Sequence, residues 1–122
     1  ISQDSCAFYE RQAIHNHFAG VVEETEEGDK IASALGDKTV LFMQNHGILT
    51  TGTSIDVALW FFFSLERCCQ SQLMADAAGA TTLIPHETAI KTREFIANDF
   101  AAWASFQPLY DMIAEKEPDL FD

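Results

Sequence analysis

The chain has few basic residues, few cysteines and no long hydrophobic run. Seven lysines and arginines stand against nineteen aspartates and glutamates, which gives the 122 residues a formal net charge of −12 at pH 7. A protein with this charge repels phosphate backbones and anionic lipid surfaces over a Debye length of about 8 Å. We therefore expect neither nucleic acid nor a membrane as a partner, and we interpret the charge mainly as a contribution to solubility.

The three cysteines form an odd set in which two, Cys68 and Cys69, are adjacent. The disulfide frameworks of small secreted domains do not have this spacing. The longest apolar run, 57–63, is much shorter than the roughly 20 residues of a transmembrane helix, and no signal-peptide pattern opens the chain. These absences predict a protein of the reducing cytoplasm.

Apolar side chains, in contrast, are abundant. Hydrophobic residues make up 48% of the chain and include ten phenylalanines and two tryptophans, which is typical of a globular protein with a core. The length suits one compact domain and is too short for two. No repeat or linker marks an internal boundary, so we expect residues 1–122 to be one domain or part of one. The start at Ile1, without a methionine, favours a processed or partial chain.

Hydrophobic periodicity and turn residues predict alternating helices and strands. The expected elements are, in order, a loop with a short helix or strand at 2–16, a short strand at 17–22, a helix over 23–35, a buried central strand at 39–43, a second strand at 48–51, a long helix over 53–78, another helix that begins at Pro85, and a broken helical tail after residue 98. Gly36 is expected to end the first helix, and Pro108 to interrupt the tail.

The long helix is expected to bury one face and to offer a second apolar surface. Residues at helical spacing form the predicted buried face: Ala58, Phe62, Leu65, Cys69 and Leu73. The cluster 60–63 is apolar nearly all round the helix, so we expect it to contact both the sheet and another layer or subunit. The adjacent cysteines diverge by about 100° on a helix, which favours core packing over a shared metal ion.

Asn45-His46-Gly47 is the most informative tripeptide of the chain. It places an imidazole at the end of a buried strand, beside a glycine that allows a positive φ or the close approach of a ligand. A turn of this kind can direct a metal ligand into a cleft. From these residues alone, a turn histidine that is hydrogen-bonded to the backbone is the stronger alternative.

His15-Asn16-His17 places two imidazoles on one face of an extended segment, from which both can reach one zinc ion at about 2.1 Å. With His46 they would make three ligands and leave an open coordination position, as in catalytic zinc sites. Two histidines this close in a loop are more often solvated, so both interpretations stay open.

Other reactive side chains give weaker indications. The acidic residues of 23–27 are interpreted as solvated groups that favour a helix N-terminus rather than as a cation site. Tyr9 and Tyr110 can donate protons, but neither has a partner recognisable in the sequence. No phosphate loop, nucleophile elbow or paired-cysteine zinc motif occurs. The residues alone therefore assign no catalytic acid, base or nucleophile.

The segment 40–52, VLFMQNHGILTTG, joins a strand, an Asn-His-Gly turn and a glycine, and SIDVA at 54–58 then opens a helix. Together with LER at 65–67 and QL at 72–73, this order resembles the second half of the class II aldolase/adducin family. SQDSCAFY near the start and FQPLY near the end resemble fungal-type members of the same family. The resemblance covers most of the chain and is weakest over 81–105.

The resemblance implies a three-layer α/β/α domain around a largely antiparallel central sheet, here truncated at the N-terminus. Family enzymes hold zinc or a similar divalent ion with three histidines, two from a His-x-His motif and one from the Asn-His-Gly turn, which here is His46. The ion stabilises an enediolate during cleavage of a ketose phosphate, or assists decarboxylation, dehydration or epimerisation. The family's histidine pair, proton-transfer acid and phosphate loops lie further upstream than His15 and His17, so the ligand role is not carried over to these two.

Three functions stand as alternatives. The leading hypothesis is a truncated relative of the metal-dependent aldehyde-lyases that keeps His46 without a complete active site. The second is an active zinc-dependent lyase, decarboxylase or epimerase, with a site from His15, His17 and His46 assembled in an oligomer and a small carbonyl compound or sugar phosphate as substrate. The third is a non-catalytic interaction module like the adducin head. Because missing strands would expose sheet edges and the surface at 60–63, we expect self-association into a homo-oligomer.

Overall fold

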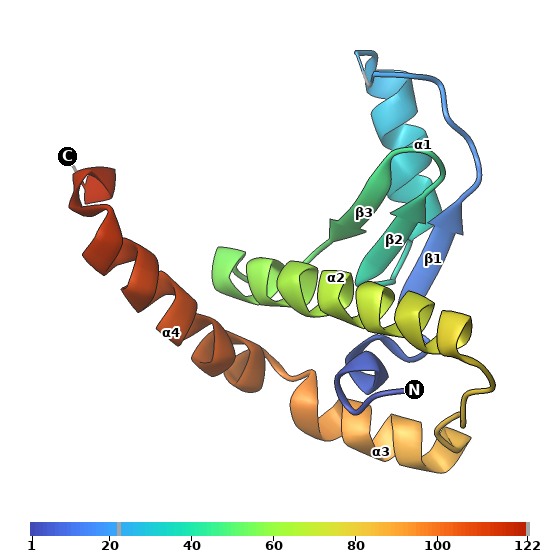
Figure 1. Cartoon of the computed structure of the whole chain (residues 1–122). Coiled ribbons are helices and arrows are strands. Elements are labelled where there is room, and N and C mark those ends of the chain that lie inside the picture. The colour runs from blue at the N-terminus through green and yellow to red at the C-terminus, as the bar shows by residue number, and fades with distance from the viewer. Residues whose placement is uncertain (22, 122) are drawn as a thin grey trace.

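A small three-stranded sheet lies between helices (Figure 1). The computed structural model describes residues 1–21 and 23–121. Its elements, in chain order, are η1 (Asp4–Phe8), β1 (Gln12–His15), α1 (Thr25–Leu35), β2 (Val40–Met43), β3 (Gly47–Thr50), α2 (Ile55–Ala78), α3 (His86–Ile96), α4 (Asp99–Lys116) and η2 (Pro118–Phe121). The two η elements are short 3-10 helices. Within the described residues, no helix combines the length and the apolarity needed to cross a membrane.

β2 is the central strand, as its apolar composition predicts. β1 pairs with it in parallel, with His15 opposite Met43, and β3 pairs with it antiparallel. In the turn between β2 and β3, Asn45 has a φ of 55°, and Gly47, which follows the turn, has a φ of 145°. The two predicted strands of this region and their tight turn are thereby confirmed.

α1 and α2 cover opposite faces of the sheet (Figure 1). Val40 lies on the face toward α2 and is fully buried beside Val57 and Phe61. Since side chains alternate along a strand, Met43 lies on the other face, where it borders a hollow together with Ile31 of α1. The chain therefore forms helix, sheet and helix layers.

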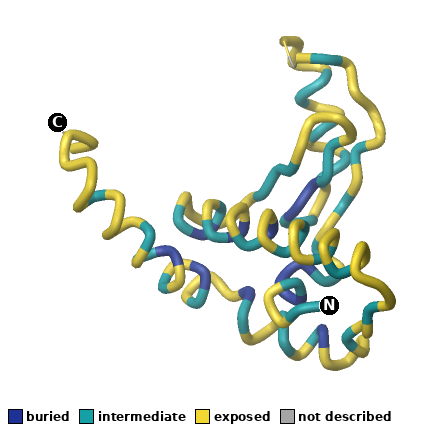
Figure 2. The backbone as a smooth tube through the Cα atoms, viewed as in Figure 1, coloured by how far each residue is buried: buried dark blue, intermediate teal, exposed yellow. Residues whose placement is uncertain are grey.

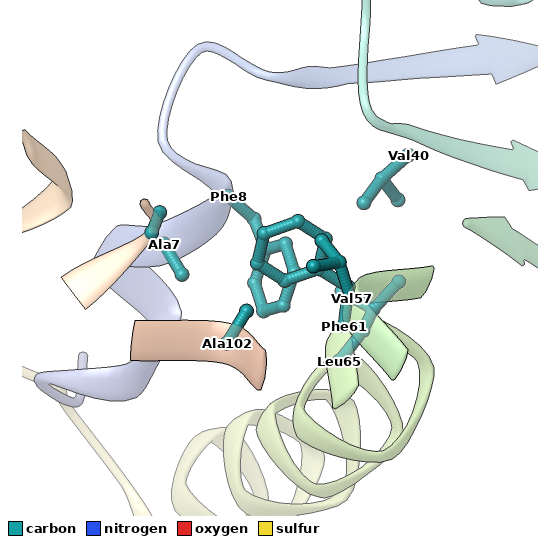
Figure 3. Close-up of a cluster of buried hydrophobic side chains, with 8 residues drawn as sticks. Ala7, Phe8, Val40, Val57, Phe61, Leu65 and Ala102 are labelled. Atoms are coloured by element: carbon teal, nitrogen blue, oxygen red, sulfur yellow. The ribbon is translucent and has the colours of Figure 1, made fainter. Parts of the chain in front are cut away.

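The core lies where η1, α2 and the start of α4 meet the sheet (Figure 3). Phe8 and Phe61 pack edge to face, with ring centroids 6.0 Å apart, and Leu65 and Ala102 belong to the same cluster. Full burial of each large apolar side chain contributes about 1.5–3 kcal/mol. The cluster thus fixes the opening residues of the chain against two helices that are distant in the sequence.

The first strand lies earlier than predicted. β1 ends at His15, and the described residues of the predicted strand 17–22 form no strand, while Val22 lies outside the described residues. The four residues of β1, QAIH, do not alternate polar and apolar side chains, so periodicity could not identify this strand. Pairing across the sheet sets its position instead: the Thr39 amide donates to the Arg11 carbonyl at 2.9 Å, where β1 and β2 begin to pair.

α2 begins and ends where the sequence predicts, but the predicted buried face was wrong by about one residue. The helix buries Val57, Phe61 and Leu65. Of the predicted face only Leu65 is buried, whereas Phe62 and Leu73 are 39% and 71% exposed. Apolar residues surround the helix at 60–63, so periodicity could not define the buried side. The packing of η1 against α2 defines it.

α4 is continuous, and the prediction of a broken tail was wrong. It contains Pro108 in its interior, while Asn98 caps its start by accepting a hydrogen bond from the Ala101 amide at 2.9 Å. A proline inside a helix removes one backbone donor. Pro108 is exposed, and the carbonyl that it leaves unpaired lies one turn earlier on the same side of the helix. The helix after Pro85 is confirmed as α3.

Candidate functional site

His46 lies at the end of the sheet, in the turn that joins β2 to β3. Its amide donates to the Met43 carbonyl at 3.1 Å, which closes the turn. The left-handed backbone of Asn45 and the positive φ of Gly47 hold this conformation at residues that tolerate it. His46 is exposed, so its imidazole is accessible at the end of the sheet.

His15 ends β1 and lies against the first turn of α1. Its Nε2 atom is 3.6 Å from Oε1 of Glu27, an ion-pair distance that is too long for a hydrogen bond. The side chain of His15 is only 11% exposed, and its buried Nε2 has no hydrogen-bond partner among the described residues. The interpretation of His15 as a solvated loop residue is therefore wrong, because strand pairing carries it under α1. His17 is exposed.

Glu27 also departs from the solvated acidic run that the sequence predicts. Its side chain is 13% exposed, compared with 83% for its neighbour Glu26. Desolvation raises the pKa of Glu27, but the hydrogen bond and the charge of Lys30, with contributions from His15 and His17, bring the pKa below its ordinary value of 4.5. The carboxylate thus stays ionised beside two imidazoles.

These groups border one small hollow of about 10 Å³, lined among others by His15, His17, Glu27 and His46. The rings of His15 and His17 are nearly perpendicular, with centroids 6.1 Å apart. The volume is about that of one water molecule. Across residues 1–21 and 23–121, however, no three His, Cys, Asp or Glu side chains are placed to hold a metal ion together. The described residues therefore do not by themselves fit a zinc centre.

The pattern of a buried strand, an Asn-His-Gly turn and a long capped helix has a counterpart in known proteins. A family model described as "Class II Aldolase and Adducin N-terminal domain" matches residues 1–73. The chain belongs to the class II aldolase and adducin family. The resemblance seen in the sequence is thus confirmed.

Two relatives in this family match nearly the whole chain. Decarboxylase NovR of Streptomyces niveus is 37% identical over 98% of the chain and 44% of its own length. The 4-hydroxy-3-prenylphenylpyruvate oxygenase/4-hydroxy-3-prenylbenzoate synthase of Streptomyces roseochromogenus subsp. oscitans is 36% identical over 98% of the chain and 43% of its own length. The chain thus spans less than half the length of these class II aldolase relatives.

The solved structure of L-fuculose 1-phosphate aldolase from Glaciozyma antarctica PI12 aligns with a TM-score of 0.82 and 37% identity, over 97% of this chain and 44% of that one. This agreement confirms the α/β fold class expected for a class II aldolase/adducin-like domain. The role of His46 as a metal ligand stays a prediction.

The structure also pairs side chains that sequence reasoning left without partners. The Tyr9 hydroxyl and Nδ1 of His86 are 2.9 Å apart and share a hydrogen bond. Arg93 also binds this residue: its Nη1 donates to the Tyr9 carbonyl at 2.7 Å. Tyr9 and His86 are 77 residues apart in the sequence, so no local pattern could have revealed the pair.

Proposed function

We propose that the chain contributes His46 as one metal ligand of a class II aldolase-type site, and that its 122 residues do not complete this site. The turn carries the proposal: left-handed backbone at Asn45 and a positive φ at Gly47 present the exposed imidazole beside a hollow at the end of the sheet. Zinc or another divalent metal is the ion we expect, because imidazole is a common ligand of such ions. The described residues supply no complete set of three ligands.

For the completed site we propose a metal-dependent lyase activity on a small carbonyl compound or a sugar phosphate. The names of the relatives include a decarboxylase and a sugar-phosphate aldolase. Both reactions break a carbon–carbon bond and leave negative charge that an adjacent carbonyl group can take up. The isolated chain is expected to catalyse neither reaction.

The main alternative is an active zinc site formed by His15, His17 and His46 in an oligomer. The observation in its favour is that all three histidines border the same hollow. A small movement of the exposed His17 and His46 would be required, since no three potential ligands of the described chain are now within reach of one ion. Metal stoichiometry separates this alternative from the proposal.

The first experiment measures zinc per chain after gel filtration for the wild type, His46→Ala and the double variant His15→Ala/His17→Ala. We expect less than stoichiometric zinc in all three, because one imidazole with water ligands holds zinc weakly. One zinc per wild-type chain, lost in both variants, would instead establish the three-histidine site. Aldol cleavage or decarboxylation by the purified wild type would also contradict the proposal.

A second measurement tests His46 directly. Zinc titration followed by the NMR signals of the imidazoles should perturb His46 more than His86, whose ring is engaged with Tyr9. The variant His86→Ala, which removes a histidine outside the hollow, should leave the response of His46 unchanged. Equal perturbation of all histidines would mean that the turn has no special affinity for metal.

A role as an interaction module is the second candidate function. The specific observation that favours it is the C-terminal arm, residues 107–121, which extends from the body of the molecule (Figure 1). Its exposed apolar side chains are Tyr110, Met112, Ile113, Leu120 and Phe121. A homo-oligomer would cover such a surface, as we expect for a chain of this kind.

A further inference from the structure

A cavity of about 500 Å³ opens between η1, the β1–β2 face and the C-terminal half of α2. Gln12 and Phe42 border it from the sheet. Strand alternation places His15 and Met43, which border the hollow near His46, on the opposite face. The cavity is therefore separate from the candidate metal-ligand turn, and it can hold a ligand whether or not that turn binds a metal.

The walls of the cavity are mainly apolar and are held in place by the fold. Phe8 and Leu65 belong to the core cluster and form its floor. Tyr9 lines one side, where the hydrogen bond to His86 fixes its hydroxyl and the bond from Arg93 fixes its backbone. Small-molecule sites in proteins are typically preformed hollows of about 300–1,000 Å³ with such linings.

Gln72 borders this cavity with a side-chain amide whose orientation is fixed by a neighbouring residue. Its Nε2 donates to Oδ1 of Asp76 at 2.9 Å. Because an ionised carboxylate can only accept, the amide nitrogen of Gln72 must face Asp76, which settles the orientation of the amide. The amide oxygen is then left to accept a hydrogen bond from another molecule. A ligand that satisfies it needs a hydroxyl or amine donor.

The electrostatic surroundings select a neutral ligand. Among the residues that the structure describes, none with a charged side chain lines the cavity, and the terminal ammonium group of Ile1 at its edge is engaged with Oγ of Ser5 at 3.3 Å. Burial raises the pKa of the Cys68 thiol, and burial together with the charge of Glu66 raises that of Cys69, so both thiols at the wall stay protonated and uncharged near neutral pH. Asp76 beside Gln72 and the net charge of −12 both disfavour an anion.

We propose that this cavity binds a neutral aromatic molecule with a hydroxyl group, a phenol, whose ring packs against Phe8, Phe42 and Leu65 and whose hydroxyl donates to the amide oxygen of Gln72. The aromatic and aliphatic walls provide the apolar contact for the ring. The amide oxygen of Gln72 provides selectivity for a ligand with a donor over an isosteric hydrocarbon.

Occupancy of the cavity can be measured through the reactivity of the two cysteines in its wall. The full chain is treated with N-ethylmaleimide, and the modification rates of Cys68 and Cys69 are measured by peptide mass spectrometry with and without p-cresol. Cys6 is 3% exposed and serves as an unreactive internal reference. We expect p-cresol to slow both modifications in a saturable way, and toluene at equal free concentration to protect more weakly. No protection by p-cresol, or equal protection by both compounds, would overturn the proposal.

The substitution Gln72→Leu removes the acceptor and keeps much of the side-chain volume. We expect it to weaken p-cresol binding about threefold to tenfold, the effect of one neutral hydrogen bond, and to leave toluene binding unchanged. Gln70→Leu is the matched control, since Gln70 is exposed on the same helix outside the cavity lining. If both variants bind p-cresol alike, Gln72 is not the acceptor. The comparison of p-cresol with toluene uses the wild type alone. It therefore remains a valid test even if Gln72→Leu or Gln70→Leu folds poorly.

Discussion

Glu27 is a carboxylate of the first turn of α1 that lies against the sheet rather than in solvent. Lys30 reaches both Glu26 and Glu27 at 3.3 Å, but only Glu27 also lies at ion-pair distance from an imidazole, that of His15. The pKa of Lys30 is raised, chiefly by the hydrogen bond to Glu27. The pair therefore links α1 to the end of β1, next to the hollow that His46 borders.

The substitution Glu27→Gln is expected to make stability less dependent on pH in the acid range. The folded-state pKa of Glu27 is below 4.5, so the ionised form stabilises the fold above that pH. This contribution is lost as the pH falls through the folded-state pKa. The difference in free energy of unfolding between wild type and variant should therefore be larger at pH 7 than at about pH 3, as measured by urea denaturation.

Glu26→Gln is the matched control for this prediction. Its side chain is 83% exposed and also meets Lys30, yet exposed ion pairs contribute only about 0–1 kcal/mol. We expect its unfolding curve to stay close to that of the wild type at both pH values. A Glu27→Gln variant that differs from wild type by the same amount at both pH values would show that the carboxylate is not the stabilising group.

At the scale of elements, the connection between β3 and α2 depends on the absence of a side chain at Gly52. A Cβ atom there would lie 2.6 Å from the Ala58 amide nitrogen and 2.8 Å from a methyl carbon of Val57. Gly52→Ala is therefore expected to displace the start of α2 from the sheet and to cost about 1–3 kcal/mol. Thermal or urea unfolding measures this loss.

At Gly28 the same substitution, glycine to alanine, is expected to raise the stability of the protein rather than lower it. It lies inside α1, and a Cβ atom there would meet nothing within 4 Å. Gly28→Ala should stabilise the protein by about 0.5–1 kcal/mol, because alanine restricts the unfolded chain and favours a helix. If Gly52→Ala were also neutral or stabilising, the close approach of α2 to this connection would be incorrect.

Local sequence patterns predicted the elements whose signals lie within one segment. β2, its turn, β3 and the bounds of α2 follow from an apolar, partly β-branched run, the Asn-His-Gly turn and a capping serine, Ser54. β1 and the buried face of α2 did not follow, because the pairing with β2 and the position of η1 determine them. The predicted break at Pro108 was wrong for the same reason. The destabilisation that a proline causes inside a helix depends on whether the helix is exposed at that point.

The candidate site, like the fold, could be predicted from the sequence only in part. The Asn-His-Gly tripeptide was sufficient to identify His46 and its place at the end of the sheet, because the turn signal lies within three adjacent residues. The approach of His15 to Glu27 requires the parallel pairing of β1 with β2 and the return of the chain through α1, which no spacing rule contains. The Tyr9–His86 hydrogen bond joins η1 to α3 across most of the chain and could not be predicted either.

At the scale of the whole molecule, α4 is buried only near its start and then leaves the body of the molecule (Figure 2). Ala102 and Phe106 are buried against the core, and residues on the same side of the helix continue this apolar stripe to Leu109 and Ile113. No described residue from Gln107 onward is buried. η2 folds back onto the end of this helix. The stripe is therefore covered over its first half alone.

The arm is expected to mediate self-association of the chain through this stripe. Ile113→Glu places a carboxylate on the uncovered part of the stripe, where burial against a second copy would carry a large desolvation cost. Met112→Glu is the matched control, because Met112 is about as exposed, 47% against 41%, but lies off the stripe by about 100°. The two variants carry the same added charge, so general repulsion affects them equally.

Light scattering over a range of protein concentrations measures the result. We expect the mass of the wild type and of Met112→Glu to rise above that of the 13.6 kDa monomer, and the mass of Ile113→Glu to stay near it. A monomeric wild type at all concentrations would mean that the net charge of −12 prevails over the apolar stripe. Equal loss of association in both variants would assign the effect to charge rather than to the stripe. Only a loss specific to Ile113→Glu identifies the exposed continuation of the α4 core face as the surface through which copies meet.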